Sequence, residues 1–123
     1  MLASEVAAED LALGRLAEQV DQAAATDAML TDCLLMQLLS QAQLHFVHEE
    51  QWLAEHAYPM RFGHAALHAQ MKAELEHALL ELRSVSDAAL RTAYGLLVRQ
   101  LVEEHSVRER IVLCGRKSFD QAG

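Results

Sequence analysis

The hydrophobic positions of this chain recur every three or four residues, which is the spacing of one face of an α-helix. Such a pattern predicts four helices, over about 4–25, 28–57, 62–82 and 88–113. No stretch alternates apolar and polar residues as a half-buried β-strand does. The pattern therefore predicts an all-α protein.

The residues between these stretches are typical of helix ends. Asp27 is a favourable N-cap for the second helix, and the stretch 84–87 holds an N-cap for the fourth. Tyr58 and Pro59 would end the second helix, because the residue before a proline is pushed away from helical angles. Gly115 is predicted to stop the last helix.

Each predicted helix carries one stripe that would face a common core. The stripes are Leu13, Leu16 and Val20; Leu34, Leu38, Gln41, His45, Glu49 and Trp52; His64, His68, Met71, Leu75 and Leu79; and Leu90, Tyr94, Leu97, Leu101, His105, Glu109 and Val112. Because short turns join consecutive helices, the sequence predicts a single domain spanning 1–123, an up-down-up-down four-helix bundle.

Metal-binding side chains interrupt the core stripes of three helices. His45 and Glu49 lie four residues apart, as do His64 and His68, so each pair shares one helical face. The last helix adds His105 to its own stripe. Imidazoles and a carboxylate that converge in a bundle core form a site for Fe, Zn, Mn or a similar ion.

Charge and composition narrow the range of partners. The formal net charge is −8, which argues against nucleic acid and against an anionic membrane surface. No apolar run is long enough for a membrane span, and the N-terminal stretch lacks the basic region of a signal peptide. We therefore expect a cytoplasmic protein, and we favour a monomer although the sequence leaves the oligomeric state open.

The central motifs resemble those of hemerythrin and the bacterial hemerythrin-like (HHE cation-binding) domains. These motifs are the run HFVHEE from His45, a YP turn, the run HAALH from His64 to His68, and His105 on the last helix. The resemblance covers essentially the whole chain. It implies a non-heme di-iron site that binds O₂ reversibly, with His64, His68 and His105 on one iron, His45 on the other, and Glu49 as a bridge.

Two positions depart from the family pattern. Leu13 stands where the family has a histidine on the first helix, and Arg110 stands where it has a bridging aspartate. Glu109 could supply the missing carboxylate, and Glu9 or Asp10 could reach in to replace the missing histidine. Relative to the last-helix histidine, position 109 lies about 40° round the helix and position 110 about 140°. We therefore expect Glu109 to face the site.

The departures leave alternatives open. The predicted ligands could hold two iron ions, a single metal ion or none, and Zn or Mn would also suit them. The leading interpretation is a protein that binds O₂ or a related diatomic for storage, transport or sensing. The alternatives are an iron-dependent enzyme that handles peroxide or NO, and a metal-free interaction or sensor module in which Arg110 pairs with Glu49. No signal of a dedicated substrate pocket appears, which favours a binding protein over an enzyme.

Overall fold

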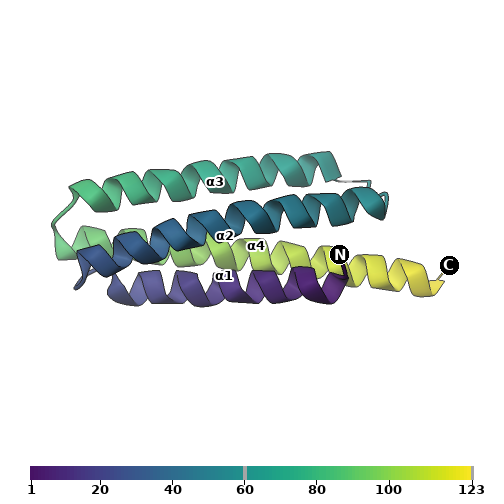
Figure 1. Cartoon of the computed structure of the whole chain (residues 1–123), viewed down its shortest axis with the longest axis horizontal. Helices are drawn as coiled ribbons and strands as arrows, with labels where there is room; N and C mark the ends of the chain where they lie inside the picture. The colour runs from purple at the N-terminus through teal and green to yellow at the C-terminus, as the bar shows by residue number, and fades with distance from the viewer. Residues whose placement is uncertain (60, 123) are drawn as a thin grey trace.

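The computed structural model describes residues 1–59 and 61–122, with the side chains of residue 61 and of residues 114–122 left out of the description. The described residues form four helices: α1 (Ala3–Ala23), α2 (Ala28–Glu55), α3 (Arg61–Ser84) and α4 (Ala88–Ala122). They lie lengthwise beside one another and alternate in direction, so the N- and C-termini lie toward the same end (Figure 1). None of these helices is both long and apolar enough to cross a membrane.

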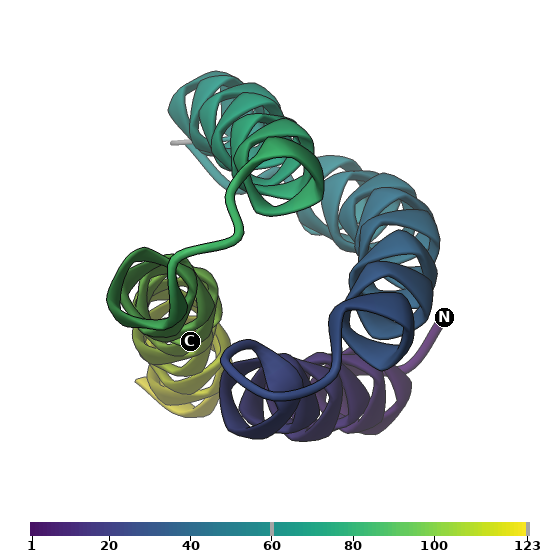
Figure 2. The ribbon, with the colours of Figure 1, turned by 90° about the vertical axis from the view of Figure 1, so that its left-hand side faces the viewer.

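The order of the helices around the bundle follows the chain. Each helix packs against its neighbours in sequence, and α4 closes the ring against α1 (Figure 2). The predicted all-α four-helix bundle is confirmed. α1 packs most closely, on both α2 and α4, whereas α3 and α4 pack least closely of the four neighbouring pairs.

The predicted helix starts are capped by side chains. Asp27 Oδ1 accepts a hydrogen bond of 3.0 Å from the Leu30 amide, and Asp87 Oδ1 accepts one of 2.9 Å from the Leu90 amide. Both bonds satisfy amides that have no partner within their own helix. α2 ends at Glu55, two residues before the predicted end, because Ala57 adopts a positive φ of 50° before the turn into α3.

Helix α4 differs from the prediction at its end. It continues through Gly115 to Ala122, beyond the predicted stop near 113. A glycine inside a helix costs about 1 kcal/mol but does not by itself end the helix. Gly115 alone was therefore a weak stop signal.

The core contains most of the predicted stripe positions, with corrections on two helices. Gln41 is exposed and Ala42 is buried in its place, while Leu90 and Leu97 are exposed and Val98 is buried. Leu97 and Val98 are adjacent apolar residues, and the pattern does not decide which of two such neighbours faces inward. Packing then rotates the helix slightly from the predicted face.

A buried arginine of α4 forms hydrogen bonds with the ends of α1 and α3, at the end of the bundle opposite the N-terminus. Arg91 is 6% exposed. Its Nε donates to the Ala24 carbonyl at 2.6 Å, and its Nη1 donates to the carbonyls of Leu82 and Val85. These carbonyls lie where α1 and α3 end, so one guanidinium satisfies backbone acceptors that the helices leave unpaired. The sequence analysis did not single out this arginine.

Candidate metal centre

Six side chains from three helices meet in the bundle core. α2 supplies His45 and Glu49, α3 supplies His64 and His68, and α4 supplies His105 and Glu109. Each pair is one turn apart, so helical geometry alone directs both members inward. All six are buried, with exposed fractions between 1% and 7%. The structure thus brings together all of the site residues predicted from the sequence.

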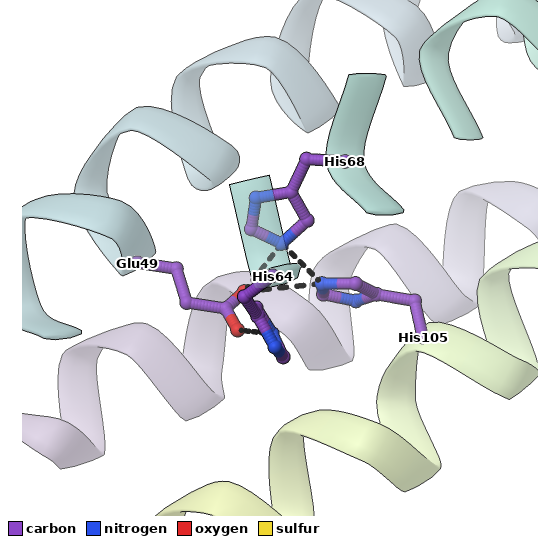
Figure 3. A group of neighbouring side chains, drawn as sticks. All are labelled: Glu49, His64, His68 and His105. Carbon is purple, nitrogen blue, oxygen red and sulfur yellow. Dashed lines mark hydrogen bonds and ion pairs between the residues drawn. The ribbon is translucent and has the colours of Figure 1, made fainter. Parts of the chain in front are cut away.

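The carboxylate of Glu49 is the centre of this arrangement (Figure 3). Its Oε1 lies 2.6 Å from His64 Nε2. Its Oε2 lies 3.0 Å from His105 Nε2, 3.4 Å from His68 Nε2 and 3.4 Å from His45 Nε2. Ligands about 2.0–2.1 Å from one ion lie roughly 3 Å apart. Glu49, His64, His68 and His105 form one group of donor atoms that could hold a metal ion.

A second group adjoins the first and shares His105. It comprises Asp10, His45, His105 and Glu109, with all four ligand atoms within 4.8 Å of one another. His45 Nε2 lies 2.8 Å from Glu109 Oε1 and 4.0 Å from Asp10 Oδ1. This group is richer in oxygen than the first.

Two atoms of the second group show that hydrogen bonding alone does not account for it. His45 Nε2 and Glu109 Oε1 lie 2.8 Å apart, as an ion pair when the imidazole is protonated, but neither atom has a hydrogen-bond partner of regular geometry within the described structure. Buried polar atoms without partners are costly. Two such atoms that face a common point are what a metal ion would satisfy, so the donor set fits a metal.

Carboxylates behind the histidines orient their rings. Glu9 Oε1 lies 3.1 Å from His45 Nδ1, and Asp10 Oδ1 lies 3.0 Å from His105 Nδ1. When a carboxylate accepts the Nδ1 proton, Nε2 is left free for a metal, an arrangement common among metal-binding histidines. Glu9 Oε2 also bonds His48 Nδ1 at 2.6 Å, so this carboxylate joins two rings of α2.

The structure shows where Leu13 and Arg110 lie, the two residues that depart from the pattern of hemerythrin-like domains. Leu13 packs in the apolar core and offers no ligand, while Asp10, one turn earlier on α1, is buried beside His105. Arg110 is exposed, and its Nε donates to the Ser106 carbonyl. The predicted inward orientation of Glu109 is confirmed. The predicted pairing of Arg110 with Glu49 in the metal-free alternative is wrong, since the regular helix turns Arg110 outward, whereas the metal-free module itself stays a prediction.

Asp10 is the residue whose place in the centre the sequence indicated only weakly. It lies on the stripe Val6, Asp10, Leu13, Ala17 and Val20, whose other members are all apolar and buried. An acidic residue at the centre of an apolar stripe is unusual, because a buried carboxylate needs partners. The acidic residue within this apolar stripe was the feature of the sequence that indicated a place for Asp10 in the centre.

Charges in the core shift the proton affinities of the metal-free centre. Burial alone would lower the pKa of His45, but the carboxylates of Glu109, Glu49 and Glu9 close to the ring outweigh it and raise the pKa to about 10. Burial would also lower the pKa of His105, but Asp10 and Glu49 outweigh this effect and raise the pKa to about 9.

The pKa values of the two buried glutamates, Glu49 and Glu109, shift in opposite directions. Burial would raise the pKa of Glu49, but the four surrounding histidines hold it well below its usual range. Burial and the nearby carboxylates of Glu49 and Asp10 raise the pKa of Glu109 to about 7, against the lowering influence of His45. Without metal, protons on the histidines balance the carboxylates; a cation would perform the same role.

Comparisons with protein-family models, curated proteins and solved structures give no match for this chain. The resemblance to hemerythrin-like domains therefore rests on the motifs of the sequence and stays a prediction.

Proposed function

We propose that this protein is a hemerythrin-like metal-binding protein whose core holds non-heme iron and binds O₂ or a related small diatomic. One observation carries the proposal. The Nε2 atoms of four buried histidines lie within 3.4 Å of the Glu49 carboxylate, and the adjoining Glu109 carboxylate has a buried oxygen without a hydrogen-bond partner. Buried carboxylates need a compensating positive charge, which a bound cation would supply in place of protons on the imidazoles.

The two donor groups favour two ions over one. Glu49, His64, His68 and His105 would hold one ion. Asp10, His45 and Glu109 would hold the other, with Glu49 placed between them. Three carboxylates would offset much of the charge of two divalent ions, which lowers their mutual repulsion.

The surroundings of the centre are suited to protecting a bound gas. Ferrous iron with an open coordination position supplies reversible binding of a diatomic. Phe46 is buried and stacks on His68, with ring centroids 4.2 Å apart and planes 9° from parallel. The apolar ring fixes the imidazole and keeps water away from it, which would limit loss of electrons or protons from the bound species.

Metal analysis combined with an optical spectrum tests this function. We expect about two ions per chain in the iron-loaded protein, and a reversible spectral change when O₂ or NO is added to the ferrous form. His68→Ala should lose at least one of the two ions, whereas His77→Ala, which alters an exposed histidine of the same helix, should keep both. Full metal occupancy in His68→Ala would overturn the assignment of the centre, and loaded protein that does not respond to either gas would overturn the gas-binding role.

A further inference from the structure

The side of the bundle between α3 and α4 differs from the other three. These helices pack least closely of the neighbouring pairs, and their ribbons stand visibly apart in Figure 2. Side chains leave a cavity of about 80 Å³ between them. Its lining contains His64, His68 and His105, so it reaches the proposed ligands directly.

The size of this cavity limits which ions or molecules can reach the buried histidines through it. Eighty cubic ångströms hold only a few water molecules, whereas pockets for organic ligands are typically about 300–1,000 Å³. The cavity is therefore of a size that suits a metal ion that sheds its water shell, or a diatomic. A larger cavity of about 600 Å³ lies at the opposite end of the bundle, between residues 25–35 and 79–91, and none of the proposed ligands lines it.

The outer part of the cavity carries charged groups from both helices. Glu74 comes from α3, while Glu104 and Arg108 come from α4. Gln70 holds Glu74 through a hydrogen bond of 3.1 Å. Glu104 and Arg108 also line a shallow hollow on the outer side of α4, together with Glu103. Carboxylates at the mouth of a narrow opening raise the local concentration of cations, and the arginine opposes them.

We propose that the opening between α3 and α4 is the route by which the metal ion reaches its buried ligands, with Glu74 and Glu104 attracting the cation. The proposal rests on the metal-binding function proposed above. It adds a kinetic role for residues that are not ligands. An ion that instead entered by local opening of the helix ends would be insensitive to these side chains.

The test measures how fast metal-free protein takes up Co²⁺ in stopped flow, together with the final number of ions bound. Leu67→Trp places a large ring at the cavity lining and should slow uptake roughly tenfold or more without changing the final stoichiometry. Leu80→Trp, at an exposed position of the same helix outside this cavity, is the matched control and should load at the wild-type rate. Equal rates in the two variants would overturn the route.

Variants that change the charge at the opening test the route independently, in case the tryptophan disturbs packing. Glu104→Gln should slow uptake several-fold at low salt, and Arg108→Gln should accelerate it, with both differences shrinking as salt is added. Glu76→Gln, at an exposed position of α3 away from the opening, should have no effect. If Glu104→Gln and Arg108→Gln changed the rate of Co²⁺ uptake in the same direction, or not at all, the proposal would be refuted. Wild-type protein that binds no Co²⁺ would instead refute the metal-binding function.

Discussion

His45 Nε2 and Glu109 Oε1 lie 2.8 Å apart in the bundle core without forming a hydrogen bond. Both residues are only 1% exposed, so water does not replace the missing hydrogen-bond partner. The pair comes from α2 and α4, and it faces the same region as Asp10. If two ions bind as proposed, this geometry makes Glu109 the residue on which the second ion depends.

We therefore expect Glu109→Ala to reduce the metal content from two ions per chain to one. Removal of a ligand that reaches only the second group should leave the ion at Glu49, His64 and His68 in place. Arg110→Ala, at the adjacent exposed position, is the control and should keep both ions. Metal analysis of the three proteins measures this, and a single ion in the wild type that Glu109→Ala does not alter would contradict it.

Helical periodicity was sufficient to predict the fold and the six inward site residues, because steps of three and four specify one face of a helix whatever its partners are. It could not decide between adjacent apolar residues such as Leu97 and Val98, since only packing against α1 and α3 rotates the helix. The parts played by Asp10 and Arg91 also needed the structure. Each makes contacts more than sixty residues away in the chain, which no local spacing reveals.

Metal removal should weaken the fold. A ligand that binds only the folded state stabilises it by about 2.7 kcal/mol when present at a hundred times its dissociation constant. For a chain of this size we expect the melting temperature to fall by roughly 10 °C after chelation. A variant that carries both His45→Ala and His68→Ala lacks a ligand of each donor group and serves as the control, because its melting temperature should not respond to chelator. Coincident melting curves for loaded and chelated wild-type protein at pH 7 would be evidence against a metal in the core.

Metal affinity should increase with pH well above the range of ordinary histidines. In the metal-free protein, His45 and His105 hold protons with pKa values of about 10 and about 9, against 6.5 for a free side chain. The metal-free form therefore binds more protons than the loaded form, and lowering the pH weakens metal binding. Competition titrations should show affinity rising roughly tenfold per pH unit for each proton displaced, up to about pH 9. A plateau above pH 7.5 would show that the two rings titrate normally.

The same shifts predict how the metal-free fold depends on pH. A raised histidine pKa contributes stability that is fully present below pH 6.5 and is lost as the pH rises through about 9 and 10. The lowered pKa of Glu49 contributes stability present above pH 4.5 and lost as the pH falls below it. Denaturant unfolding of metal-free protein should thus show stability that falls between about pH 6.5 and about pH 10 and then levels off, and His45→Gln should remove part of that fall.

Arg91 should be among the residues on which stability depends most. Arg91→Ala would leave the carbonyls of Ala24, Leu82 and Val85 without this donor at the helix ends, at a cost of about 3 kcal/mol. Arg83→Ala removes an exposed arginine paired with Asp32 and should change stability little. Chemical unfolding of both variants checks the difference, and equal midpoints would show that water replaces the buried guanidinium without loss.

The contact between α1 and α4 predicts opposite effects for two glycine substitutions. A Cβ added at Gly95 would lie 2.7 Å from Ala24 Cβ and 3.2 Å from the Asp21 Cα, neither of which can move without shifting α1. Gly95→Ala should therefore force the two helices apart and destabilise the protein by about 1–3 kcal/mol. A Cβ at Gly14 meets nothing within 4 Å, so Gly14→Ala should stabilise the protein by up to about 1 kcal/mol through helix propensity alone. Unfolding midpoints measure both changes. If Gly95→Ala were as stable as Gly14→Ala, the close approach of α1 and α4 at this level would be wrong.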